Sequence, residues 1–319
     1  MRPMRIFEYI VITFAAILMV ASCTVDQLWQ GSDPQGEERV LTFEPRFEDF
    51  EAATKAIGGG DLIDQLLVQV YDEDGNFVLE KKYSVEDCEV QQTVEIPFFK
   101  NNEYRVYFWA YHSADCAYTI ADGKLKNGVK INYPESTELL KFNSLEYLDA
   151  FYAVEEIDLS DTNEEAISIT LTRPFAQVNI AADKYQLQSA KATKVEIIVS
   201  AATSYDFVDG PESETSELKF TFEHTNYFQD TEDISEGKVY LGTTYLFVPS
   251  AVTLTDAVQK FTAKVGLYDE AGTLLKEQSD VEIPLSINNR TNIILSDIEP
   301  AETPSEGDAT NPTDQVDVE

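Results

Sequence analysis

Few side chains in this sequence have the type and spacing that catalysis needs. The chain holds two histidines, His112 and His224, and we expect each to be an ordinary strand or loop residue rather than a base or a metal ligand. No serine or cysteine stands in a local frame that indicates an activated nucleophile. The run DEDG at residues 72–75 lacks the spaced ligands and the distal glutamate of a calcium loop, so a turn is the favoured interpretation. The sequence therefore predicts a non-catalytic protein without cofactor or metal.

One cysteine stands where its chemistry is defined. Cys23 follows a short basic head, an apolar run over residues 10–20 and two small residues, which is the pattern of an export signal. The stretch VASC also resembles a bacterial lipobox, in which the cysteine becomes the acylated N-terminus. The apolar run is shorter than the roughly 20 residues that a membrane-spanning helix needs. We expect residues 1–22 to be a lipoprotein signal peptide and Cys23 to anchor the protein at the outer membrane and cell surface; an ordinary signal peptide with an incidental cysteine is the alternative.

The composition describes a strongly acidic chain with enough apolar residues to fold. Lys and Arg number 23 against 58 Asp and Glu, which gives a formal net charge of -35 at pH 7. Such a surface repels phosphate backbones and anionic headgroups, which excludes nucleic acid as a partner. Hydrophobic residues make up 43% of the chain, which suffices for packed cores. Residues 23–39 are expected to be a flexible tether and residues 300–319 a disordered acidic tail.

Between these ends, apolar residues alternate with polar ones at a period of two, which predicts antiparallel strands with one buried face. The clearest runs cover residues 66–70, 94–98, 167–171 and 195–199. Residues 104–111 are apolar or aromatic on both alternating faces, so we expect a central strand that is covered on both sides. Only residues 136–157 carry a helical stripe of apolar residues, and we expect one short helix at most.

A local repeat indicates how the strands are grouped. VYDEDGNFVLEKKYS, from Val70, aligns with LYDEAGTLLKEQS, from Leu267. Further on, VEIPFFKNNEYRVYF aligns with VEIPLSINNRTNIIL. Each half should therefore contain a strand, a tight turn closed by Gly75 or Gly272, and a second strand, followed by a hairpin at the Asn-Asn pair.

The repeat and the period together predict the fold class and the domains. We expect an all-β protein with two tandem antiparallel β-sandwich domains, at residues 40–163 and 164–299. The boundary falls in the polar stretch DLSDTNEE at residues 158–165, where the alternation stops.

Two further cysteines, Cys88 and Cys116, are predicted to form a disulfide. Export places them in a compartment that permits disulfides, and with Cys23 assigned to lipid they are the pair that is left. Folding residues 94–100 back on residues 103–112 as a hairpin brings the two cysteines to within about one residue of register, which a bulge can absorb. Two free buried thiols are the alternative.

Several of these segments carry a family resemblance. LEYLDAFYAVEEIDLS followed by ITLTRPFAQVNI, and the closing INNRTNIIL, resemble the fimbrillin-like (type V pilin-related) surface lipoproteins of Bacteroidota, including a branch known only as a domain of unknown function. Fimbrillins are pilus subunits with two transthyretin-like, immunoglobulin-like sandwich domains. In the pilus stalk they are trimmed at a basic residue near the end of the first strand, so that a neighbour's donor strand can replace that strand.

The resemblance implies a processing site between Lys55 and Ala56. Three glycines follow at residues 58–60, as suits a protease-accessible segment. Leu41, Phe43 and Phe47 lie upstream at strand spacing, so cleavage would release a strand and open a hydrophobic groove. The family usually has arginine at this site, and an incidental lysine in a flexible loop is the alternative interpretation.

The C-terminal tail departs from the pattern of a stalk pilin. A donor strand needs alternating apolar side chains, and after Pro300 only Val316 and Val318 are apolar and spaced by two. The resemblance therefore implies a non-catalytic, lipid-anchored protein of adhesion, or a tip or accessory pilus subunit. Its partners would be other pilin subunits, joined by strand addition, or a host or glycan surface. The alternative is a monomeric carbohydrate-binding surface lipoprotein.

Overall fold

The computed structural model describes residues 38–48, 60–99, 103–114, 117–141, 144–159, 166–223, 237–248, 259–285, 287–296 and 317–318. These residues are mostly strand, which confirms the all-β class. The strands are β1 (Glu38–Phe47), β2 (Gln65–Asp72), β3 (Phe77–Glu86), β4 (Glu89–Val90), β5 (Val94–Phe99), β6 (Glu103–Tyr111), β7 (Tyr118–Ile120), β8 (Val129–Ile131), β9 (Leu139–Leu140), β10 (Ala150–Asp158), β11 (Ala166–Leu171), β12 (Phe175–Asp183), β13 (Ala192–Ala201), β14 (Ser204–Asp206), β15 (Gly210–Pro211), β16 (Ser216–Glu223), β17 (Lys238–Phe247), β18 (Gln259–Asp269), β19 (Leu274–Leu285), β20 (Arg290–Leu295) and β21 (Asp317–Val318). Helical turns are η1 (Ala121–Gly123), η2 (Leu125–Asn127), η3 (Glu146–Leu148) and the α-helix α2 (Lys184–Ala190).

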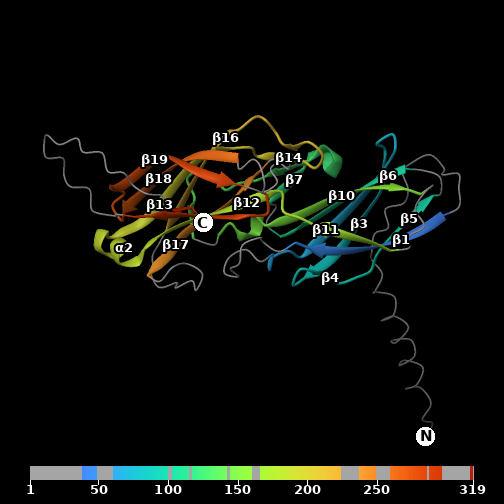
Figure 1. Ribbon diagram of the computed structural model, residues 1–319, viewed down its shortest axis with the longest axis horizontal. Coiled ribbons are helices and arrows are strands. Elements are labelled where there is room, and N and C mark those ends of the chain that lie inside the picture. Colours follow the sequence, from blue (N-terminus) through green and yellow to red (C-terminus); the bar gives the residue numbers. More distant parts are fainter. Residues whose placement is uncertain are drawn as a thin grey trace, which may run out of the picture.

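Two sheets at one end of the molecule form the first sheet pair, on the right of Figure 1. One has the order β11-β1-β5 and the other the order β10-β6-β2-β3-β4. β6 lies between β10 and β2, as expected for a central strand, and both of its faces are buried. Phe108 on one face joins the core of the first sheet pair, and Trp109 on the other face joins a second, larger core.

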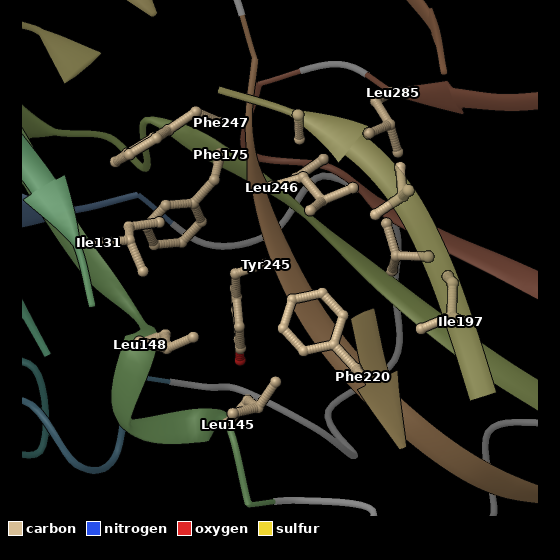
Figure 2. Close-up of a cluster of buried hydrophobic side chains, with 14 of the residues drawn as sticks. Ile131, Leu145, Leu148, Phe175, Ile197, Phe220, Tyr245, Leu246, Phe247 and Leu285 are labelled. Carbon is tan, nitrogen blue, oxygen red and sulfur yellow. The ribbon is translucent and has the colours of Figure 1, made fainter. Parts of the chain in front are cut away.

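Two further sheets form the second sheet pair, on the left of Figure 1, with the orders β17-β12-β20-β21 and β19-β18-β13-β16-β9. Figure 2 shows the middle of its core, where the ring of Tyr245 lies among Leu145, Leu148 and Phe220. The same core takes in Trp109 of the first sheet pair. The two sheet pairs are therefore held together by a continuous packed interface.

The first part of the predicted repeat, a strand, a tight turn and a second strand, is confirmed, and the two turns make equivalent hydrogen bonds. In the β2–β3 turn, the Gly75 N–H donates to the Asp72 carbonyl at 2.9 Å, and the Asp72 carboxylate accepts from the Asn76 N–H at 2.7 Å. In the β18–β19 turn, the Gly272 N–H donates to the Asp269 carbonyl at 3.0 Å, and the Asp269 carboxylate accepts from the Thr273 N–H at 2.7 Å. Both glycines have the positive φ that this turn requires, 75° and 80°. DEDG is thus a turn, as expected.

The hairpins predicted after these turns are wrong in both halves. β5 pairs with β1, whereas β6 pairs with β2 and β10 in the opposite sheet. Likewise β19 pairs with β18, whereas β20 pairs with β12 in parallel. The physical reason is that consecutive strands can bury their apolar faces by crossing to the facing sheet as well as by pairing with each other. The chain therefore crosses from one sheet to the facing sheet between β5 and β6, and again between β19 and β20.

The α-helix lies at another place in the chain than expected. Residues 136–157 include β9, η3 and most of β10, and their buried side chains divide between the two cores. Leu145 and Leu148 join the larger core, whereas Phe151 joins the core of the first sheet pair. The α-helix is α2, capped by the Asp183 carboxylate, which accepts from the N–H groups of Tyr185 and Gln186. The expected boundary at residues 163–164 lies outside the described residues, but β11, just after it, pairs with β1 of the first sheet pair. Within the described ranges, no helix is long and apolar enough to cross a membrane.

Candidate functional site

The first strand occupies the centre of its sheet, where its removal would leave a gap. β1 pairs antiparallel with β5 over residues 38–43 and parallel with β11 over residues 42–47. These two neighbours are therefore joined through β1. The groove that β1 fills is the candidate functional site, and we call it the β1 groove.

Alternate side chains of β1 point into the core of the first sheet pair. Leu41 is 0% exposed and Phe43 is 2% exposed, whereas Val40, which directly precedes Leu41, is 51% exposed. The ring of Phe43 lies 5.4 Å from that of Phe108. Phe47, at the end of the strand, meets the ring of Phe151 edge to face at 5.0 Å. The predicted spacing of Leu41, Phe43 and Phe47 on one face of a strand is thus confirmed.

A buried arginine marks the end of the β1 groove. Arg173 lies between β11 and β12, and its Nε and Nη2 donate to the two carboxylate oxygens of Asp149 at 2.8 and 3.0 Å. Its Nη1 donates at 3.1 Å both to the backbone carbonyl of Glu48, directly after β1, and to the Asn288 side chain. The guanidinium also lies over the Phe151 ring, 4.0 Å from its centroid. One side chain therefore connects the end of β1 with the second sheet pair.

The electrostatics of this cluster follow from its burial. The side chains of Arg173 and Asp149 are each 2% exposed, so both charges have left water. Burial raises the pKa of Asp149 above its usual value, and the facing Arg173 guanidinium opposes that rise. Because the two groups form a bidentate pair, each compensates for the desolvation of the other. The cluster is therefore a positioning device, without an open face on which chemistry could occur.

Most of the site residues predicted from the sequence lie outside the described residues. This applies to Cys23, Lys55, Ala56 and Cys116, and it also applies to His224, which we expected to be an ordinary residue. Lipidation at Cys23 and processing between Lys55 and Ala56 therefore stay predictions.

His112, which we expected to be an ordinary strand or loop residue, lies close to Asp64 and Ser113. His112 Nδ1 lies 3.7 Å from an Asp64 carboxylate oxygen, and the Ser113 hydroxyl donates to the same oxygen at 3.0 Å. In the part of the chain that the structure describes, no three His, Cys, Asp or Glu side chains gather in a way that could hold a metal ion.

The disulfide was expected because residues 94–100 and 103–112 were predicted to form a hairpin. That reason fails, because β5 and β6 do not pair. Cys88 nevertheless lies near the loop that precedes β2, since a Cβ placed on Gly60 would be 2.6 Å from its Sγ. From the other direction, the Ser113 N–H donates to the Asp64 carboxylate of that loop at 2.8 Å. The segments that lead to Cys88 and Cys116 thus approach one loop. The disulfide stays a prediction, and thiol labelling of the unfolded, non-reduced protein tests it.

A groove of about 580 Å³ lies elsewhere, at the ends of β2, β6 and β10. Its aromatic residues Tyr71, Tyr104 and Tyr107 are 1%, 4% and 4% exposed, and Tyr71 packs edge to face against Tyr107. Several of its charged side chains have partners, because Arg105 forms an ion pair with Glu156 and Lys126 lies over the Tyr71 ring. None of the three rings offers an open face to a sugar, so this groove gives no support to a carbohydrate-binding role.

Sequence reasoning missed the Arg173 cluster. Its members stand in motifs that were visible, with Arg173 in TRPF and Asn288 in INNR. A charged residue between two apolar strands signals a buried ion pair. The partner, Asp149, could not be identified because acidic residues are abundant in this chain.

Comparison with solved structures shows which proteins share this fold. A "putative adhesin" from Bacteroides ovatus matches with a TM-score of 0.50 and 14% identity, over 81% of this chain and 89% of that one. A "putative cell adhesion protein" from Bacteroides eggerthii matches with a TM-score of 0.50 and 13% identity, over 91% of this chain and 97% of that one. At this level of identity the likeness concerns the fold. It confirms the resemblance in architecture that the sequence motifs predicted.

Comparison at the level of sequence gives the family. No curated protein matches the chain. A family model described as a "Family of unknown function (DUF6562)" matches residues 34–294, which includes the Arg173 cluster, all strands from β1 to β19 and most of β20. The chain therefore belongs to the family of unknown function DUF6562.

Proposed function

We propose that this protein is a non-catalytic, lipid-anchored cell-surface protein of fimbrillin type, acting in adhesion or as a tip or accessory pilus subunit. In this proposal the two sheet pairs are its two transthyretin-like domains. Its working element is the β1 groove, which accepts an extended segment of another protein chain after β1 has left. The adhesin and cell-adhesion names of the two structures with this fold support a role at the cell surface.

The proposal rests on one observation: β1 lies between β5 and β11, and these two strands do not pair with each other. β5 and β11 both pair with β1 over six residues. Loss of β1 would therefore expose two strand edges and the apolar floor that Leu41 and Phe43 cover. Unpaired backbone edges beside an apolar groove are the features that strand addition uses.

The position of the proposed cleavage site couples maturation to anchoring. β1 lies between Cys23 and Lys55 in the sequence, so cutting after Lys55 leaves the rest of the chain attached to the lipid only through the pairing of β1. Exchange of β1 for another strand would then free the body from the membrane. In the uncut chain, the same pairing holds the body at the surface.

Lysine-specific proteolysis tests the groove. The strand contains Arg39 and Arg46 but no lysine, so a lysine-specific protease can cut at Lys55 without cutting β1 itself. The cut protein should lose β1 slowly and then bind an added labelled peptide of residues 38–49, whereas a Lys55→Gln variant treated in the same way should not bind it. A cut protein that has released β1 and does not bind this peptide would contradict the proposal.

Membrane fractionation tests the anchor independently. The wild-type protein should sediment with membranes and carry a diacylglyceryl group on Cys23 in mass spectrometry. The Cys23→Ala variant should appear in the soluble fraction. An unmodified wild-type N-terminus at another residue would rule out the lipid anchor.

A further inference from the structure

We propose that Arg173 and Phe151 select the strand that fills the β1 groove, by recognising its C-terminal end. The occupant would be an extended segment of a different protein, with apolar residues at the positions of Leu41 and Phe43 and an aromatic residue at the position of Phe47. The segment must also continue far enough to present the backbone carbonyl that Glu48 presents now. This inference rests on the proposed exchange of β1 and specifies what that exchange accepts.

The aromatic requirement comes from Phe151. Its ring lies between two partners, with Phe47 edge to face at 5.0 Å and the Arg173 guanidinium 4.0 Å from its centroid. Phe151 itself is 1% exposed while Phe47 covers it. An occupant without an aromatic residue at this position would leave the Phe151 ring, and the cation above it, open to water.

The requirement for a continuing backbone comes from Arg173. The bidentate pair with Asp149 fixes the plane of the guanidinium, so the direction in which Nη1 points is also fixed. Nη1 donates to the Glu48 carbonyl, and the Glu48 N–H in turn donates to the Leu171 carbonyl at 2.9 Å. A strand that stopped at the position of Phe47 would leave a buried cationic donor without this acceptor, which is costly.

The direction of the strand and its sequence pattern further restrict which segments could occupy the β1 groove. It must run antiparallel to β5 and parallel to β11, as β1 does. Residues 300–319 of this chain contain no aromatic residue. The tail of a second copy therefore lacks the side chain that Phe151 would recognise, and the proposal assigns the occupant to a different protein.

Peptide competition tests the inference on protein of wild-type sequence. The full chain is cut at Lys55, a fluorescent peptide of residues 38–49 is exchanged into the groove, and unlabelled peptides compete for it. A Phe47→Ala peptide should compete about tenfold to a hundredfold more weakly, because it loses an aromatic contact and apolar area. A peptide with an ester in place of the amide after Glu48 should compete about threefold to tenfold more weakly, because its carbonyl is a poorer acceptor. The matched control is a Val40→Ala peptide, which should lose less than about twofold because Val40 is exposed.

A double-mutant cycle tests whether the ester weakens the binding of the peptide through Arg173. In an Arg173→Lys protein, the ester penalty should shrink to less than about twofold, because lysine cannot reproduce the fixed donor. Equal competition by the Phe47→Ala and Val40→Ala peptides, an ester penalty unchanged in Arg173→Lys, or full competition by a peptide of residues 300–319 would overturn the inference while leaving strand exchange standing. If even the peptide of native sequence fails to exchange, the proposed function falls and the inference falls with it.

Discussion

Replacing Arg173 with methionine should destabilise the protein far more than a typical substitution does. Methionine fills much of the same volume but leaves the Asp149 carboxylate, which is 2% exposed, without its cation. Breaking a buried ion pair by removing one partner costs about 3–5 kcal/mol, because the remaining charge stays desolvated. Since a whole domain is stable by only about 5–15 kcal/mol, this loss should move the unfolding midpoint strongly.

Urea denaturation measures the loss, with the fluorescence of the fully buried Trp109 as the probe. The matched control is the double variant Arg173→Met/Asp149→Asn, which removes the charge along with its partner. It should recover a large part of the lost stability, because a neutral amide needs far less compensation than a carboxylate.

The pH dependence of the same variant gives a second check. Without Arg173, the buried Asp149 should hold its proton more tightly in the folded protein than in the unfolded chain. Stability should then rise as the pH falls from 7 to about 5, and the gap to wild type should narrow. A loss below about 1 kcal/mol that does not change with pH would refute the argument that Asp149 is a buried charge held by Arg173.

Three further outcomes follow from the structure. Burial raises the pKa of Glu155, so the folded protein binds this proton more tightly than the unfolded chain does; stability measured by urea should rise as the pH falls from 7 toward about 4.3, and Glu155→Gln should reduce that rise. Gly242→Ala should cost about 1–3 kcal/mol in the same assay, since the new Cβ would lie 2.4 Å from the buried ring of Phe222; a neutral result would contradict this close packing. Asp269→Ala should lower the thermal midpoint by the loss of one turn hydrogen bond worth about 0.5–1.5 kcal/mol, and Asp72→Ala should lower it at least as much, because the Asp72 carboxylate also accepts from the Asn76 side chain; a smaller effect of Asp72→Ala would argue against equivalence of the repeated turns.

Features that depend on near neighbours along the chain could be predicted from the sequence. The period of two identified the strands, because successive side chains of a strand point to opposite faces. The repeated turns at Gly75 and Gly272 were predictable, because a positive φ favours glycine and a short polar side chain can accept from a backbone N–H three or four residues on. The apolar face of β1 followed from the spacing of Leu41, Phe43 and Phe47 for the same local reason.

The pairing of the strands could not be predicted in this way, because it depends on how the sheets pack in three dimensions. An apolar face can be buried by pairing with the next strand or by packing on the facing sheet, and the sequence of β5 and β6 is compatible with both. The Arg173 cluster was equally out of reach, since its partners Glu48, Asp149 and Asn288 come from distant parts of the chain. Each of these contacts exists because β1, β10 and the crossover into β20 converge on one point, and that convergence is set by how the sheets pack rather than by any local pattern.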